Sequence, residues 1–124
     1  MAYGPKVMEH FQNPRNAGVL EDANAVGDEE NPACGDVARL FLRIEGGRIL
    51  AARFQARGCP ASIAACSMTT EMVSGKTLAK VEGLSREDIA RALGGLPESK
   101  VHCSVLAADA LRKALEDYRR HAGS

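Results

Sequence analysis

Residues 37–57 read VARLFLRIEGGRILAARFQAR, in which two stretches of alternating apolar and polar side chains flank Gly46-Gly47. Alternation with a period of two is typical of strands that bury one face and expose the other. We therefore expect strands at 37–45 and 48–56, joined as an antiparallel hairpin.

The register of this hairpin follows from the positions of its apolar residues. A two-residue turn at Gly46-Gly47 pairs Ile44 with Ile49 and puts Leu50 on the face opposite Leu42. A three-residue loop instead pairs Ile44 with Leu50 and keeps the apolar side chains of both strands on one face. The pattern predicts a hairpin with a β-bulge or a longer loop, with Leu50 facing inward.

The segment before the hairpin, residues 1–33, predicts a short helix followed by a mobile loop. The helix is expected at 3–12, because Asn13-Pro14 interrupts the helical spacing. Residues 21–30 then hold five carboxylates and neither Lys nor Arg. Such a run is typical of a solvated surface, so we expect a loop that continues to the hairpin at 34–57.

The segment after the hairpin, residues 58–121, predicts helices only. Pro60 suits the first turn of a helix that ends near Ser74, and Thr77 and Ser85 are good N-cap residues for two more. The last helix is expected at 103–121. One antiparallel sheet followed by helices predicts an α+β fold in a single domain over residues 1–124.

Composition excludes several classes of function. Sixteen Lys and Arg balance sixteen Asp and Glu, which argues against nucleic acid or an anionic membrane as the main partner. No stretch approaches the roughly 20 apolar residues of a membrane-spanning helix. The N-terminal stretch does not resemble a signal peptide, so we expect a reducing cytosol, where cysteines are ligands, nucleophiles or core residues.

Four cysteines carry the main functional signal. Cys34, Cys59, Cys66 and Cys103 form no closely spaced Cys-x-x-Cys pair, which excludes a zinc finger or a thioredoxin-type site. Cys66 lies in an apolar stretch, about 10.5 Å along the helix from Cys59, and is expected in the core. Cys59 and Cys103 are expected at helix N-termini, where the helix dipole lowers a thiol pKa, so both are predicted to be reactive.

Two further side chains accompany the cysteines at the boundaries of the predicted elements. Asp36 follows Cys34 by two residues, and Gly35 between them allows the backbone to turn both side chains toward one point. His102 directly precedes Cys103, which favours a ligand or proton-transfer role. His10 and His121 are expected on the surface.

Three segments of the chain resemble the signature segments of a known family. They read Pro32-Ala33-Cys34-Gly35-Asp36, Gly58-Cys59 leading into Ser62-Ile63-Ala64, and Lys100-Val101-His102-Cys103-Ser104. In order, flanking residues and spacing they closely resemble the IscU/NifU iron–sulfur cluster assembly scaffold proteins, and the NifU N-terminal domain in particular. The likeness extends from Tyr3 to Ala110 and covers nearly the whole chain.

The resemblance implies a fold, a function and a set of ligands. The fold is α+β with a three-stranded antiparallel sheet, of which the hairpin supplies two strands. The function is a scaffold on which a [2Fe–2S] cluster is built from iron and sulfur and then handed on, a carrier rather than an enzyme. The implied ligands are Cys34, Cys59 and Cys103, completed by Asp36 or His102. Cys103 matches the position that accepts persulfide sulfur, and Asp36 matches one that keeps the cluster labile.

The resemblance also implies partners. They are a cysteine desulfurase, apo-acceptor proteins and a heat-shock chaperone at Leu96–Lys100, although this segment reads Leu-Pro-Glu-Ser-Lys where many relatives have Leu-Pro-Pro-Val-Lys. Tyr3 matches a residue tied to persulfide handling and subunit contact, and the chain is expected to be a monomer or a homodimer. Pro60 and Cys66 depart from the family, which usually has smaller residues at both positions.

Two alternatives remain open at this point. The first is a zinc-bound sulfur acceptor that activates a cysteine desulfurase, as SufU-type relatives do. Those relatives carry an insertion between the second and last ligand cysteines, whereas Cys59 and Cys103 are only 44 residues apart, which favours the scaffold. Three thiolates and one further ligand also suit Zn²⁺, so zinc is expected to compete for the same site on isolation. The second is a thiol redox enzyme with a reversible disulfide between Cys59 and Cys66.

Overall fold

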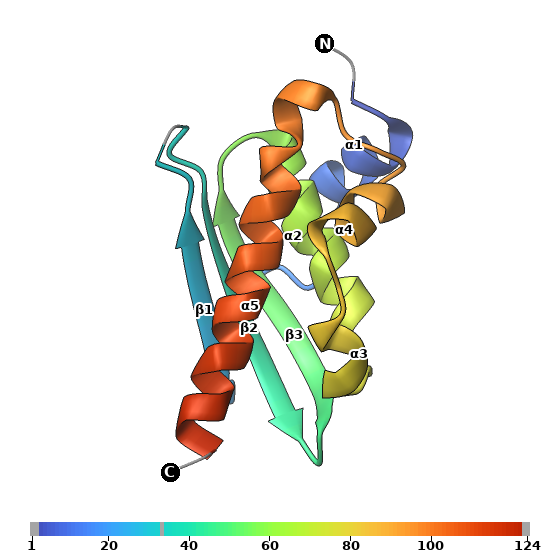
Figure 1. The fold of residues 1–124 in the computed structure, drawn as a ribbon. Helices are drawn as coiled ribbons and strands as arrows, with labels where there is room; N and C mark the ends of the chain where they lie inside the picture. The colour runs from blue at the N-terminus through green and yellow to red at the C-terminus, as the bar shows by residue number, and fades with distance from the viewer. Residues whose placement is uncertain (1–2, 33, 123–124) are drawn as a thin grey trace.

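The computed structural model describes residues 3–32 and 34–122, which form a three-stranded sheet covered by helices (Figure 1). The elements, in chain order, are α1 (Pro5–Gln12), β1 (Ala25–Glu30), β2 (Val37–Glu45), β3 (Arg48–Arg57), α2 (Pro60–Val73), α3 (Leu78–Glu82), α4 (Arg86–Ala92), the 3₁₀ turn η1 (Glu98–Lys100) and α5 (His102–Ala122). This confirms the predicted α+β class. No helix within the described ranges has the length and apolar character needed to cross a membrane.

The sheet is antiparallel in the order β1-β2-β3, and its first strand corrects the sequence prediction. Residues 25–30 were expected in a mobile loop, but they pair with β2 from Ala25 opposite Leu42 to Glu30 opposite Val37. The buried positions of this strand are Ala25 and Gly27, so the strand lacks the large apolar residues that mark alternation. Pairing with β2 and packing under α5 decide its conformation, not local propensity.

The hairpin of β2 and β3 contains a β-bulge, one of the two predicted solutions. Ile44 pairs with Ile49 across Gly46-Gly47, while Arg43 pairs with Ala51, so Leu50 is the extra residue. Beyond the bulge the predicted pairing holds. Leu50 is 51% exposed and Ile49 is buried, so the prediction that Leu50 faces inward was wrong. Because of the bulge, the hairpin has a tight turn at Gly46-Gly47 and still keeps the apolar side chains of both strands on one face.

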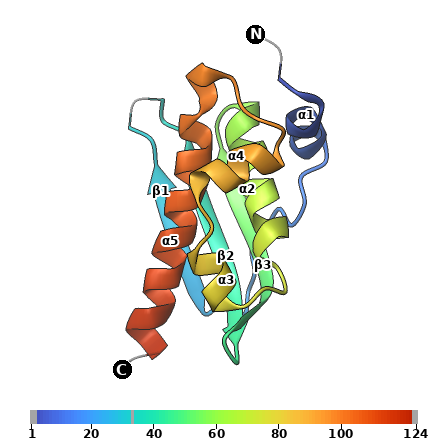
Figure 2. The ribbon, with the colours of Figure 1, turned by 45° about the vertical axis from the view of Figure 1, so that its right-hand side comes forward.

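Helices α2 and α5 cover one face of the sheet, and α4 and α1 pack against them (Figures 1 and 2). The core between these layers is mostly aliphatic and includes Leu40, Leu42 and Ile44 of β2. Gly27 allows α5 to approach β1 closely, because a Cβ there would lie closer than 3.0 Å to backbone atoms of Ala110 and Ala114. The small residues of α5 and β1 therefore set the distance between helix and sheet.

The predicted N-caps are confirmed. The Thr77 side chain accepts a hydrogen bond from the Lys80 amide at the start of α3. Ser85 and Asp88 form a reciprocal capping box at the start of α4. These bonds satisfy amide groups that have no partner within the helix, so α3 and α4 begin directly after the predicted N-cap residues.

His10 is buried, which corrects its predicted place on the surface. Its side chain is packed between α1 and α2, where Nδ1 lies 2.8 Å from Ser67 Oγ and Nε2 lies 3.4 Å from Glu71 Oε1. Burial, aided by the charge of Arg15, lowers the pKa of His10 below its usual 6.5, against the opposing effect of Glu71. The imidazole is therefore held neutral in the folded protein.

The folding stability is expected to fall as the pH drops through about 6.5, because the unfolded chain then binds a proton that folded His10 resists. Neutral His10 contributes its full stabilisation above that pH. The contribution decreases as the pH falls toward the lower pKa of folded His10, and the free energy of unfolding changes by at most about 1.4 kcal/mol per pH unit. Urea unfolding of wild type and His10→Gln between pH 5 and 8 checks this. The exposed His121→Gln variant is the control, and parallel pH dependences in wild type and His10→Gln would refute the prediction.

Candidate functional site

The candidate site lies where three separate segments meet at one end of the sheet (Figure 1). The first segment leads into β2 and carries Cys34 and Asp36, the second joins β3 to α2 at Cys59, and the third begins α5 with His102 and Cys103. The structure thus brings together all five side chains that the sequence singled out. It keeps Cys66, the fourth cysteine, apart from them in the core.

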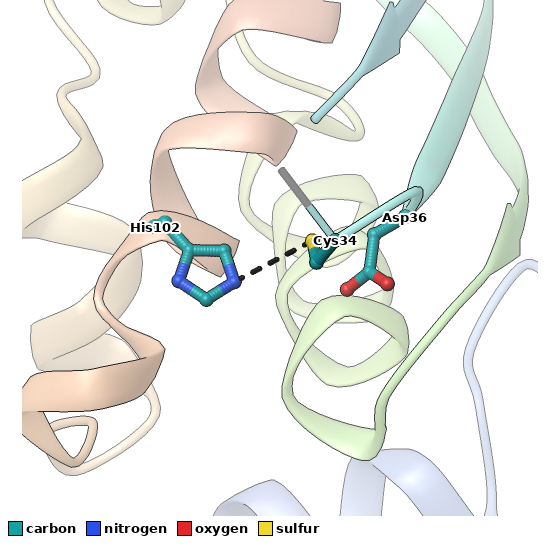
Figure 3. Close-up of side chains that lie close together, drawn as sticks. All are labelled: Cys34, Asp36 and His102. Carbon is teal, nitrogen blue, oxygen red and sulfur yellow. Dashed lines mark hydrogen bonds between the residues drawn. The ribbon is translucent and has the colours of Figure 1, made fainter. Parts of the chain in front are cut away.

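The side chains approach one another closely. Cys59 Sγ and Cys103 Sγ are 3.6 Å apart, and His102 Nε2 lies 3.6 Å from Cys103 Sγ. His102 Nε2 also lies 3.8 Å from Cys34 Sγ (Figure 3). The donor atoms form two overlapping groups in which all atoms lie within 4.8 Å of one another, and Asp36 belongs to both. One compact centre can therefore draw on all five.

The backbone on the Asp36 side of the site depends on a glycine. Gly58 has a φ of +152°, and a Cβ at this position would lie closer than 3.0 Å to the carboxylate atoms of Asp36. Cys59 follows as the N-cap residue of α2, and Pro60 occupies the first turn, where a missing N–H costs nothing. Gly58 therefore lets the β3–α2 connection pass directly over Asp36.

Asp36 is a buried carboxylate held by hydrogen bonds. It is 7% exposed, and it accepts a 2.5 Å hydrogen bond from Ser62 Oγ. Burial acts to raise the pKa of Asp36, but the hydrogen bonds from Ser62, Cys59 and Cys34 outweigh it, and the net result is a lowered pKa. Asp36 is therefore an anion before any metal arrives.

Cys103 corrects the prediction of a lowered pKa at a helix N-terminus. Its side chain is fully buried, and burial together with the neighbouring Cys59 and Asp36 raises the pKa of the Cys103 thiol to about 12, although a hydrogen bond from Ser62 opposes the shift. The helix dipole does not overcome this loss of solvation. Cys103 is a neutral thiol in the metal-free fold and must lose its proton when it binds a cation.

The site opens to solvent on the side of Cys34 and His102. Cys34 is exposed and His102 is partly exposed, whereas Cys103 and Asp36 are buried. On the η1 side, Cys59 and Tyr3 raise the pKa of Lys100, whose ammonium group therefore lies close to the site. The buried side chains of Cys103 and Asp36 thus form the floor of the site, and the more exposed side chains of Cys34 and His102 form its rim.

Cys66 is a core residue, as predicted. It is fully buried on α2, and burial, with a smaller effect of Cys103, raises the pKa of the Cys66 thiol to about 12. All four cysteines are free thiols. A protonated thiol packed in the core has neither the charge nor the access of a ligand.

The donor set decides which chemistry the site supports. Three thiols, one carboxylate and one imidazole converge from separate segments, and thiolates select iron–sulfur centres and zinc over hard cations such as Mg²⁺ or Ca²⁺. A tetrahedral metal ion takes four ligands, so with five donors present one side chain can replace another at the metal. Such an arrangement can bind a metal centre and also release it.

Two residues at the site were not among the side chains that the sequence pattern predicted to be functional. Ser62 was quoted only as part of a signature segment, and Gly58 only as the neighbour of Cys59. Both act on Asp36, Ser62 by a hydrogen bond and Gly58 by its missing side chain. A signal for Ser62 existed, because a residue three positions after an N-cap residue shares its side of the first helical turn.

Comparison with known sequences gives one consistent group. The model of the NifU-like N terminal domain family matches residues 2–124. The chain is 51% identical over 121 residues to the iron–sulfur cluster assembly scaffold protein IscU 1 of Archaeoglobus fulgidus, covering 98% of this chain and 79% of that protein. It is 48% identical over 118 residues to IscU of Aquifex aeolicus, covering 94% and 75%.

Comparison with solved structures supports the fold. A NifU-like N-terminal protein from Brucella abortus superposes with a TM-score of 0.76 at 16% identity, covering 94% of each chain. FiSufU from Fervidobacterium islandicum superposes with a TM-score of 0.72 at 23% identity, covering 91% of this chain and 96% of that one. The arrangement of sheet and helices is thus the one these proteins share.

Proposed function

The chain belongs to the NifU-like N-terminal domain family, and from that premise we propose that it is a scaffold on which an iron–sulfur cluster is assembled for transfer to other proteins. The observation that carries the proposal is the convergence of Cys34, Cys59 and Cys103 with Asp36 and His102 in one partly open site. Relatives 48–51% identical bear the name of iron–sulfur cluster assembly scaffolds. The chain acts as a carrier whose cargo is the cluster.

The proposed ligands are the three converging cysteines, with Asp36 or His102 as the fourth. Soft thiolates hold iron in a [2Fe–2S] centre, and a carboxylate or imidazole holds it less tightly than a fourth sulfur would. Asp36 is buried and His102 is partly exposed, and their donor atoms lie within 4.8 Å of each other, so either can offer the fourth position. Zn²⁺ suits the same donors and is expected to compete for them.

Sulfur is proposed to arrive at Cys103 from a cysteine desulfurase. The Cys103 thiol gives up its proton as its sulfur attacks the outer sulfur of the desulfurase persulfide, the sulfur–sulfur bond there breaks, and the desulfurase cysteine leaves as a thiolate that takes up a proton. Cys103 then carries the persulfide, and a thiol or other reductant must supply two electrons to convert this sulfur to sulfide. Because Cys103 is fully buried, the transfer requires local opening of the site.

Delivery is proposed to apo-acceptor proteins that offer a complete ligand set. The rim formed by Cys34 and His102 gives such a partner direct access to the centre. A heat-shock chaperone at Leu96–Lys100 stays a prediction. In the structure, residues 98–100 of this segment form the 3₁₀ turn η1, which leads directly into the site at His102. The monomeric or dimeric state also stays a prediction.

Anaerobic reconstitution tests the proposal. Incubation of the zinc-free protein with a cysteine desulfurase, cysteine and ferrous iron is expected to give the visible absorption of a [2Fe–2S] cluster, with iron and acid-labile sulfide in equal amounts. Addition of an apo-ferredoxin should then move the cluster to it. A protein that binds zinc, stimulates the desulfurase and never holds a cluster would instead match the sulfur-acceptor alternative and overturn the scaffold.

A further inference from the structure

We propose that Ser62 is a positioning residue that holds Asp36 ready to bind the cluster. Ser62 lies in the first turn of α2, three residues after Cys59, and its side chain is fully buried. It is not one of the five candidate ligands. The inference rests on the proposed scaffold function and adds to it the group that orients one ligand.

The first step is the hydrogen bond between the two side chains. Ser62 Oγ donates to Asp36 Oδ2 over 2.5 Å, and both residues are buried. A hydroxyl bound to a carboxylate at this distance makes a strong, charge-assisted hydrogen bond. Cys59 and Cys34 also donate hydrogen bonds to this carboxylate, so Asp36 is bonded to two other candidate ligands as well as to Ser62.

The second step is the restriction of Asp36 from another direction. The backbone of Gly58 passes so close to the carboxylate that a single added Cβ would overlap it. With Gly58 packed against it and Ser62 bound to one oxygen, the Asp36 carboxylate has little freedom to rotate. It is fixed within 4.8 Å of candidate sulfur donors on all three segments.

The third step is the contact of Ser62 with a second candidate ligand. Ser62 Oγ lies 3.6 Å from Cys59 Sγ, so one hydroxyl touches both a carboxylate and a sulfur of the site. Outer groups that orient metal ligands typically change metal retention by about 10- to 100-fold when they are removed. Ser62 is therefore expected to set how long the scaffold keeps its cluster, acting through Asp36.

The test measures the rate at which the reconstituted protein loses its cluster to a ferrous iron chelator. Ser62→Ala removes the hydroxyl from a helical position that suits alanine, and we expect the rate of cluster loss to change by about tenfold, together with the visible circular dichroism spectrum of the cluster. Ser62→Thr restores a hydroxyl and is expected to return the rate toward that of wild type.

The matched control is Ser67→Ala. Ser67 is also a fully buried serine of α2, but its hydroxyl contacts His10 and the Arg15 amide rather than the site. This variant is expected to lower the urea midpoint and to leave the rate of cluster loss unchanged. An equal change of the rate in both variants would mean that Ser62 acts only through general stability and would overturn the inference.

A double-mutant cycle separates action through Asp36 from other effects. In the Asp36→Ala background, adding Ser62→Ala is expected to change the rate and the spectrum much less than in wild type, because the hydroxyl then keeps only its weaker contacts with thiols. An undiminished effect of Ser62→Ala in that background would overturn the inference, as would a wild-type rate in the single variant. Wild type that assembles no cluster would instead refute the proposed function itself, so the two failures are distinguishable.

Discussion

Cys103→Ser is expected to abolish the assembly of a stable cluster. The sulfur of Cys103 lies at the centre of the site, 3.6 Å from both Cys59 Sγ and His102 Nε2. A serine hydroxyl ionises far less readily than a thiol and is a hard donor, so the iron loses one of three soft thiolates, and the remaining carboxylate and imidazole hold it less tightly. We expect at least about a tenfold fall in cluster bound after anaerobic reconstitution, measured by absorbance, iron and sulfide.

The matched control for this variant is Cys66→Ala. Cys66 is also a buried thiol with a pKa near 12, but it lies in the core of α2 and outside both groups of candidate ligands. We expect Cys66→Ala to cost about 1 kcal/mol of stability and to bind a full complement of cluster. The assignment of Cys103 as a ligand would be wrong if Cys103→Ser kept its cluster. The assignment of Cys66 as a core thiol would be wrong if Cys66→Ala alone lost the cluster.

Gly27→Ala is expected to cause a large loss of stability. The new Cβ would lie closer than 3.0 Å to backbone atoms of Ala110 and Ala114, and backbone cannot rotate away as a side chain can. Either α5 moves off β1 or the strand shifts. Overpacking of this kind costs about 3 kcal/mol, a large fraction of the stability of a small domain.

Urea unfolding at constant pH measures this loss as a lower midpoint. The control is Gly4→Ala, since a Cβ at Gly4 would meet no atom within 4 Å and its φ of −67° suits alanine. We expect that variant to unfold within about 0.5 kcal/mol of wild type. An unchanged midpoint for Gly27→Ala would contradict the close packing of α5 on β1.

Local patterns predicted the elements that have strong local signals. The hairpin carries alternating apolar residues, α3 and α4 begin at good N-caps, and Pro60 opens α2. In these segments the preferences of neighbouring residues agree with the final fold. A β-bulge was one of two predicted solutions for the hairpin, but the prediction placed Leu50 inside, and only the complete pairing with β2 puts it outside.

Local patterns failed where the environment is supplied by distant parts of the chain. The acidic stretch before Cys34 looked like a loop, yet β1 forms because β2 offers an edge and α5 covers its two small inward residues. His10 looked like a surface residue, yet the chain folds it against Ser67 and Glu71 of α2. The expected low pKa of Cys103 failed for the same reason, because burial exceeds the effect of its helix N-terminus.

The sequence by itself determined which residues could form the site, because Cys34, Cys59 and Cys103 each stand beside residues that break or begin an element. Only the tertiary structure decided that they meet, that Asp36 reaches both groups of donors, and that Ser62 and Gly58 hold it there. The physical reason is the distance along the chain over which each interaction acts. Turns and caps are fixed by neighbours along the chain, whereas burial, pKa and the convergence of ligands depend on contacts between segments far apart in sequence.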